Sequence, residues 1–249
     1  MANWSDPRSS ASPFGGAATQ AGTQSAAFDA GLRSYMLRVY NYMASGVLLT
    51  GIIAMVFAAS GYVQVLFGAN GTSLLGYVVM FAPLLVVLAM SFGQNRMSQG
   101  TLQMLFWGFA VLMGLSLSTI FLVYTGGSIA GAFFSTAAGF AALSLYGYTT
   151  KRDLTALGTF MIIGVVGLLV ASIVNIFLQS GTLGLVISAI GVLVFAGLTA
   201  YDTQKTKSLY YQVRGTAEEG KVVVMSALNL YLDFINMFLF ILRLFGNRN

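Results

Sequence analysis

The chain has 249 residues, of which 57% are hydrophobic and 8% are charged, and its net charge is +5. A soluble domain carries about 25% charged residues, so a water-soluble fold of this size would lack the charged surface that it needs. The sequence contains neither Cys nor His. This excludes disulfides, thiolate nucleophiles, Ser-His catalysis and the common zinc and haem sites. The basic residues are dispersed between hydrophobic segments, a pattern that sets membrane topology. We therefore expect a protein of the lipid bilayer with no resident cofactor and no nucleic-acid partner.

The first segment, residues 1–30, is rich in Ala, Gly, Ser, Thr and Gln, and it includes Pro7 and Pro13. Such a composition buries too little apolar surface to compensate for the entropy lost on ordering, so we predict a disordered tail. The segment also lacks the apolar core of a secretory signal. Residues 31–249 are predicted to form one transmembrane domain.

Seven hydrophobic runs follow the tail, each 19 to 23 residues long. At about 1.5 Å per residue, a helix of this length matches a hydrocarbon layer about 30 Å thick. The sequence therefore predicts an all-α integral membrane protein with seven transmembrane helices. The runs are Tyr40–Ala59, Leu74–Phe92, Leu102–Tyr124, Ile129–Tyr148, Leu157–Leu178, Leu183–Tyr201 and Val222–Leu244.

The connections between the runs alternate between basic and uncharged. The loops near residues 61–72, 125–128 and 180–182 carry no charge, whereas the others hold Arg or Lys. Because basic loops remain in the cytoplasm, the amino terminus is predicted to be cytoplasmic. The last run conflicts with this rule: if it crosses, Arg243 and Arg248 lie outside. The sequence leaves open whether this run crosses or dips in and returns.

Small residues recur at every fourth position in two runs. Gly131, Ser135 and Gly139 do so in the fourth run, and Gly114 and Ser118 in the third. Small residues at this spacing allow helix backbones to approach closely in lipid, but 29 glycines also produce chance matches.

Asp233 lies near the middle of the last run. An ionised Asp at the centre of a helix in lipid costs about 2.5–3.5 kcal/mol, so it needs protein, water, a partner or a proton. Ser226, Asn229, Asp233 and Asn236 recur at spacings of three and four, which places them on one helix face. This face predicts a polar seam inside the bundle.

Asp202 ends the sixth run and stands one helical turn before Lys205. In one interpretation it is an interfacial residue beside Lys205. In the other, a short loop folds the last run against the sixth and brings Asp202 towards Asp233. Two carboxyl groups that share a site cannot both ionise cheaply, so such a pair would titrate as a unit and sense pH without His. Asn175 in the fifth run is a third buried polar residue, either a partner in this seam or a helix-to-helix hydrogen-bonding group.

Several motifs carry a family resemblance over about residues 30–246. They are Tyr201-Asp202-Thr203-Gln204, the closing segment from Ala227 to Asn236 (ALNLYLDFIN), Ile241-Leu242-Arg243 and Val174-Asn175-Ile176-Phe177. In these motifs the chain resembles the bacterial branch of the Bax inhibitor-1 family.

The resemblance implies a bacterial inner-membrane protein in which six helices surround a central seventh. It also implies a pH-sensitive, calcium-permeable leak gated by two aspartates, which correspond to Asp202 and Asp233. The family pattern includes an arginine after the second helix that latches onto the aspartates. Here Gly93 and Gln94 stand near the matching place, and Arg96 is the nearest candidate for the latch.

The sequence leaves three functions in competition. The first is a leak for calcium or other cations, because Ca²⁺ prefers oxygen ligands and Asp202 and Asp233, with Asn229 and Asn236, could attract the ion transiently.

The second is an intramembrane aspartyl protease, and the pair Tyr201-Asp202 argues for it. Against it, Asp233 lacks framing glycines, and Pro83 stands in Ala-Pro-Leu rather than Pro-Ala-Leu. The third is a non-catalytic regulator that binds other membrane proteins, such as a quality-control protease. We expect that the chain is not an enzyme.

Overall fold

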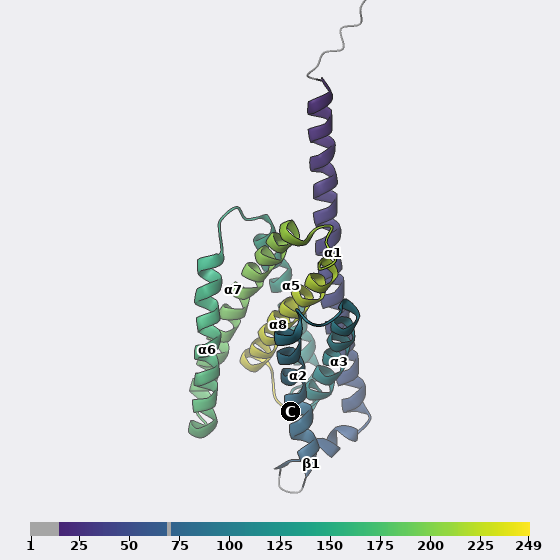
Figure 1. Cartoon of the computed structure of the whole chain (residues 1–249). Coiled ribbons are helices and arrows are strands. Elements are labelled where there is room, and N and C mark those ends of the chain that lie inside the picture. Colours follow the sequence, from purple (N-terminus) through teal and green to yellow (C-terminus); the bar gives the residue numbers. More distant parts are fainter. Residues whose placement is uncertain (1–14, 69–70) are drawn as a thin grey trace, which may run out of the picture.

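The computed structural model describes residues 15–68 and 71–249, with side chains from residue 29 onward. The chain is helical almost throughout (Figure 1). A short 3₁₀ helix, Tyr62–Leu66, and a hairpin of β1 (Phe67–Gly68) and β2 (Gly71–Thr72) lie between the first two helices. The helices are α1 (Gly15–Ala59), α2 (Leu74–Gly93), α3 (Gln99–Leu117), α4 (Ile120–Val123), α5 (Gly126–Thr149), α6 (Thr155–Leu178), α7 (Gly181–Val213) and α8 (Glu219–Phe245).

Seven helical segments of the described chain are long and apolar enough to cross a membrane. They comprise residues Asp29–Ala59 of α1, all of α2, Gln99–Val123 across α3 and α4, and the whole of α5, α6, α7 and α8. Each contains or closely overlaps one predicted hydrophobic run. The predicted all-α fold with seven transmembrane helices is confirmed.

Helix α8 forms the centre of the bundle. It packs against α1, α3, α5 and α7, while α2 packs on α3 and α6 packs on α7 outside this inner ring. In the most apolar stretch of α8, 67% of the residues are buried, against 6% for α6. The predicted central position of the last helix is thus confirmed, and α2 and α6 form the flanks.

A polar bridge joins three helices inside the core beside α8. The Tyr231 hydroxyl lies 2.7 Å from Oγ1 of Thr50, which in turn donates to the carbonyl of Ala110 at 2.8 Å. The Tyr231 ring packs edge-on against Phe109 at 5.0 Å between centroids. In hydrocarbon each buried hydroxyl needs a partner within the protein, and this bridge supplies one while joining α1, α3 and α8.

The first helix differs from the prediction for residues 1–30. Helix α1 begins at Gly15, so residues 15–30 continue the first transmembrane helix as additional turns. Ala is frequent in this stretch and has the highest helix propensity, and adding residues to an existing helix avoids the cost of nucleation. Residues 1–14 of the predicted tail lie outside the described residues.

The glycines that allow close helix contact are only partly those predicted. A Cβ on Gly114 would lie 2.7 Å from Ile53 Cβ and 2.8 Å from the Thr50 carbonyl oxygen, so α1 and α3 do touch there. A Cβ added to Gly131 or Gly139 would have no described neighbour within 4 Å, and the prediction for the fourth run is wrong. The close contact of that helix is made instead by Gly147, where a Cβ would overlap the backbone of Ala200 on α7.

The two ends of the bundle differ in charge. The basic end contains the connections at residues 94–98, 150–154 and 214–218, and the uncharged-loop end contains those at 60–73, 124–125 and 179–180. Beyond α8, the backbone N–H of Thr125 donates to Asn247 O at 3.1 Å, and that of Asn249 donates to Val123 O at 3.0 Å. The last run therefore crosses the bundle without a break, and its tail is held at the uncharged-loop end, opposite the side from which α1 projects (Figure 1).

This arrangement predicts that the C-terminus and the α7–α8 connection lie in different compartments. A reporter that is active in only one compartment, fused after Asn249 or inserted at Gly215, should give opposite signals in cells. Equal signals from the two positions would contradict the crossing of α8.

The Gly147 contact predicts a second result. Gly147→Ala should destabilise the protein by about 1–3 kcal/mol, because the added methyl group must displace backbone atoms of α7. Gly139→Ala, on the same helix, is the matched control and should leave the thermal unfolding temperature of the purified protein unchanged or slightly raised. Equal unfolding temperatures for the two variants would contradict the contact.

Candidate functional site

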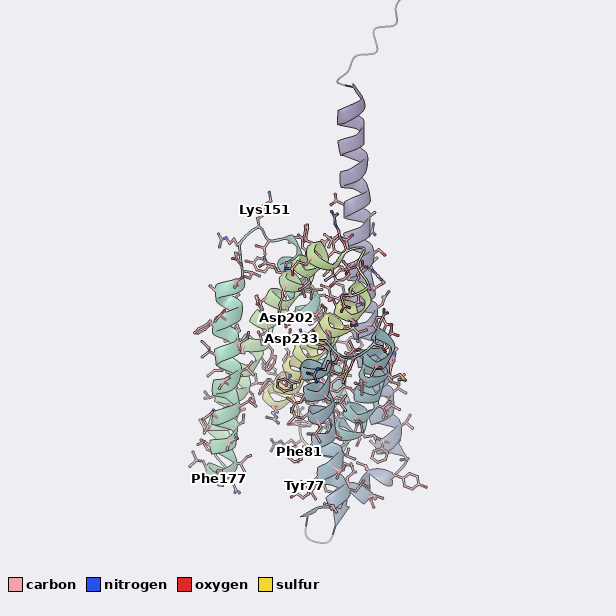
Figure 2. The ribbon with its side chains drawn as sticks, in the orientation of Figure 1. Tyr77, Phe81, Lys151, Phe177, Asp202 and Asp233 are labelled. Carbon is pink, nitrogen blue, oxygen red and sulfur yellow. The ribbon has the colours of Figure 1, made fainter. Side chains whose placement is uncertain are left out.

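Two carboxyl groups, one from α7 and one from α8, face each other where these helices pack together. Asp202 projects from α7 and Asp233 from the middle of α8, and the two side chains lie close enough for each to act on the other electrostatically. Asp233 is only 4% exposed, and its Oδ2 atom has no hydrogen-bond partner among the described residues. Figure 2 places the pair between Lys151 at one end of the bundle and Phe177 at the other. Two acids from adjacent helices thus form one buried site.

The structure corrects the position of Asp202 in its helix. Helix α7 continues to Val213 rather than ending at Tyr201, so Asp202 lies within the helix and not at its end. Lys205, one turn further on, is the cation that acts on both aspartates. The two interpretations of Asp202 therefore describe two neighbours of one side chain: Lys205 on one side and Asp233 on the other.

The residues next to Asp202 fix α7 against its neighbours. The ring of Tyr201 lies against Gly158 of α6, so closely that a Cβ on this glycine would overlap it. Thr203 is fully buried, and its hydroxyl donates to Ser144 Oγ on α5 at 3.4 Å. Along one turn of α7, successive side chains therefore contact α6, α8 and α5.

Gln204 completes this set by binding the connection between α5 and α6. Its Oε1 accepts from the Leu154 backbone N–H at 2.8 Å, and its Nε2 donates to the Arg152 carbonyl at 2.8 Å. The motif Tyr201-Asp202-Thr203-Gln204 thus joins four different parts of the structure. In the sequence, this motif was identified only through the family resemblance. The roles of Thr203 and Gln204 become apparent only in the tertiary structure, where their partners on other elements are known.

The other predicted seam residues of α8 share its inner face without joining the acid pair. Ser226 is buried and faces the Tyr35 hydroxyl of α1, and Asn229 is half-buried. Asn236 donates from Nδ2 to the carbonyl of Leu232 in its own helix at 2.8 Å. The polar face of α8 is therefore real, and Asp233 is its member that pairs with Asp202.

Asn175 and Arg96 lie elsewhere. The Asn175 side chain accepts from the Ser180 backbone N–H at 3.1 Å, where α6 ends at the uncharged-loop end. It stabilises its own turn and does not belong to the seam. Ser188 of α7, which lines the same cavity as Asn175, precedes Asp202 by about 14 residues, or about 21 Å of helix. Arg96 is exposed in the turn between α2 and α3 and makes no ion pair with either aspartate. The cation beside the pair is Lys205 instead.

A polar cavity of about 370 Å³ opens at the basic end next to this site. Tyr201 and Lys205, on either side of Asp202 in the sequence, line it together with the 151–155 connection. Asp153, which also lines the cavity, accepts hydrogen bonds from the Thr155 hydroxyl and backbone N–H, and these lower the pKa of the Asp153 carboxyl. The cavity therefore reaches residues on either side of Asp202, but neither Asp202 nor Asp233 lines it.

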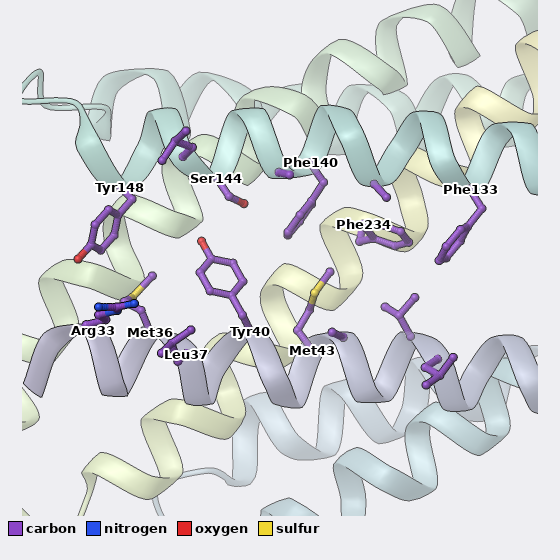
Figure 3. A pocket seen from close by; sticks show the side chains of 16 residues that line it. Arg33, Met36, Leu37, Tyr40, Met43, Phe133, Phe140, Ser144, Tyr148 and Phe234 are labelled. Atoms are coloured by element: carbon purple, nitrogen blue, oxygen red, sulfur yellow. The ribbon is translucent and has the colours of Figure 1, made fainter. Parts of the chain in front are cut away.

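A larger cavity of about 780 Å³ separates α1 from α5 (Figure 3). Phe234, which follows Asp233, lies at its base, and Phe140, Phe133 and Met43 line its walls. Arg33 and Tyr148 lie at its basic end. Because nearly all of this lining is hydrocarbon, the groove suits lipid chains and offers no route for an ion.

Within the described residues, no group of three or more acidic side chains converges, and the sequence has no His or Cys. Ca²⁺ takes about six to eight oxygen ligands. Asp202 and Asp233 alone can supply four carboxylate oxygens, which suits transient contact with an ion that keeps part of its water shell.

Fold and site together define a class: a polytopic α-helical membrane protein with a buried acid pair at the centre of its bundle. A model of the family described as inhibitor of apoptosis-promoting Bax1 matches residues 32–249. The chain belongs to this family, the Bax inhibitor-1 family.

Similar proteins occur in several bacteria. The protein RP147 of Rickettsia prowazekii is 50% identical over 222 residues, which cover 89% of this chain and 92% of that one. The inner membrane protein YbhL of Escherichia coli is 47% identical over 221 residues, covering 88% of this chain and 94% of YbhL. A Caulobacter vibrioides protein is 45% identical over 225 residues, covering 88% and 90%. None of these three names describes an enzyme.

The Gln204 contacts predict a local effect of substitution. Gln204→Met keeps the length of the side chain but removes both hydrogen bonds, so the Leu154 amide should exchange its hydrogen about fivefold faster, as expected for the loss of about 1 kcal/mol. Hydrogen exchange of the 150–154 segment measures this. Gln94→Met, in an exposed turn at the same end of the bundle, is the control. Unchanged exchange at Leu154 would show that Gln204 does not hold the connection.

Proposed function

We propose that this chain is a pH-sensitive leak for calcium or other cations in a bacterial inner membrane, with its amino terminus in the cytoplasm. The Asp202–Asp233 pair is its gate. The observation that carries the proposal is the contact between two carboxyl groups from neighbouring helices in the interior of a membrane bundle. The inner membrane location of YbhL and the basic loops on the amino-terminal side support the placement.

The gate works through the proton that the two acids share. With one proton between them, a carboxyl group donates to a carboxylate, and this hydrogen bond holds α7 against α8. Without a proton, two negative charges about 4 Å apart repel by about 4 kcal/mol at an effective dielectric constant of about 20. A change of this size is enough to alter the packing of two helices, because helix contacts in a packed core have discrete arrangements.

Lys205 acts as the latch in this proposal. It lies one turn from Asp202, interacts with both aspartates, and lines the polar cavity through which an ion would enter. Its ammonium group competes with an incoming cation for the same carboxylates. The resemblance placed this role on an arginine near Arg96, and the position of Lys205 beside the pair supports a lysine in its place.

The gate predicts that replacing one acid removes the pH sensitivity of the leak. In Asp233→Asn the amide still hydrogen-bonds to Asp202, but no proton is shared, so the flux should vary little with pH. The measurement is calcium uptake into proteoliposomes that contain a fluorescent calcium indicator, over acidic to mildly alkaline pH. Asp29→Asn, the same change at an exposed acid of α1 that lines none of the cavities described above, is the matched control and should keep the wild-type profile.

In the same assay Lys205→Gln should raise the basal flux, because the competing cation is gone. The absence of calcium flux from the wild-type protein at every pH would overturn the leak. A wild-type pH profile in Asp233→Asn would overturn the gate while leaving the leak intact.

A further inference from the structure

A second polar cavity, of about 580 Å³, lies at the uncharged-loop end, far from the acid pair. It is enclosed by the end of α6, the beginning of α7, the end of α8 and the chain beyond it. Its polar lining consists of Tyr124, Ser172, Asn175, Gln179, Ser180, Ser188, Arg243 and Arg248. Among the described residues, no acidic side chain lines it. The gate described above makes no use of this cavity.

The charge at this end is unusual for a membrane protein. Arg243 and Arg248 are the only charged side chains there, because every other charged residue of the described chain lies at the basic end or on the inner part of α7 and α8. Neither guanidinium forms an ion pair with a described residue. Their aromatic contacts are long, 5.9 Å to the ring of Phe240 and 6.0 Å to that of Tyr124. Two arginines without a carboxylate partner in the described chain therefore face one cavity, on the side where topology disfavours them.

The other groups around the cavity also offer positive charge or hydrogen-bond donors. Helix α7 begins there, and Gly181 and Gly184 of its first turns line the cavity, so the positive end of the helix dipole faces it. The Asn175 Oδ1 is occupied by the Ser180 N–H, which leaves its Nδ2 amide free to donate. Guanidinium groups bind phosphate with two parallel hydrogen bonds. This chemistry fits an anion, and a phosphate group in particular.

The rim of the cavity indicates where that phosphate comes from. Ile176 and Leu185 line the cavity and are 69% and 53% exposed, on surfaces that face lipid. A phosphate at the arginines would therefore sit at the membrane interface, with apolar helix surface beside it for acyl chains. An ammonium on the same headgroup would be repelled by the two guanidinium groups.

We propose that Arg243 and Arg248, with Asn175, bind the phosphate of an anionic phospholipid headgroup in the leaflet at the uncharged-loop end. The bound lipid neutralises the arginines and joins α6, α7 and α8 at the end opposite the gate. The site is independent of the leak, since its ligand and its residues are different.

Lipid binding to the purified, delipidated full-length protein tests the site. Phosphatidylglycerol, phosphatidylcholine and inorganic phosphate are titrated separately, and bound lipid is counted by native mass spectrometry. Phosphatidylglycerol should bind more tightly than phosphatidylcholine, and Arg243→Gln with Arg248→Gln should weaken it by about tenfold or more, as expected for the loss of a charged hydrogen bond. Arg96→Gln with Lys151→Gln removes the same charge from the basic end and should leave this binding unchanged.

Three results would overturn the proposal. They are equal binding of the two lipids, retention of phosphatidylglycerol binding by the double arginine variant, and inorganic phosphate displacing the lipid at equal concentration, which would make the ligand a free anion. Thermal unfolding without added lipid checks that the variants are folded. If the double variant is not folded, the Arg248→Gln single variant, whose substitution lies in the chain beyond α8, takes its place.

Discussion

A carboxyl group in hydrocarbon sets the conditions for the rest of this structure. Asp233 stands in the middle of a membrane helix, where water cannot solvate it, and it persists there because the protein surrounds it. Helix α8 therefore occupies the centre of the bundle, enclosed by four other helices. The acid that meets Asp233 comes from α7, and together they form one polar site that can hold a shared proton.

Helix α7 fixes the geometry of that site. Around Asp202, the side chains of Tyr201, Thr203 and Gln204 each contact a different neighbour. Two residues before Asp202, at Ala200, Gly147 lets the backbones of α5 and α7 touch. Further along, Gly191 receives the ring of Phe240 where α7 and α8 cross. Small residues and satisfied polar contacts take the place of the hydrophobic effect, which gives little drive to helix association in lipid.

Charge divides the molecule into two chemically different ends. The ion pairs Arg38–Glu219 and Lys221–Glu218 lie at the basic end. At the uncharged-loop end of the described chain, two arginines stand without a carboxylate. In our proposals the acid pair handles cations and protons, and the arginine cavity holds an anionic lipid. These two sites need not communicate, because each satisfies its own local electrostatics.

The sequence by itself determined the class of protein, the seven helices and Asp233 as the buried acid. Helix length, hydropathy and the cost of a charge in lipid are local properties, so they can be obtained from a single segment. Only the tertiary structure decided that Asp202 meets Asp233 from inside a longer helix, that Lys205 and not Arg96 lies beside the pair, and that Asn175 belongs to the opposite end. It also decided that α8 crosses completely and that Gly147, not Gly139, makes a close contact. These facts depend on which faces of separate helices meet, and spacing within one helix carries no information about its partner.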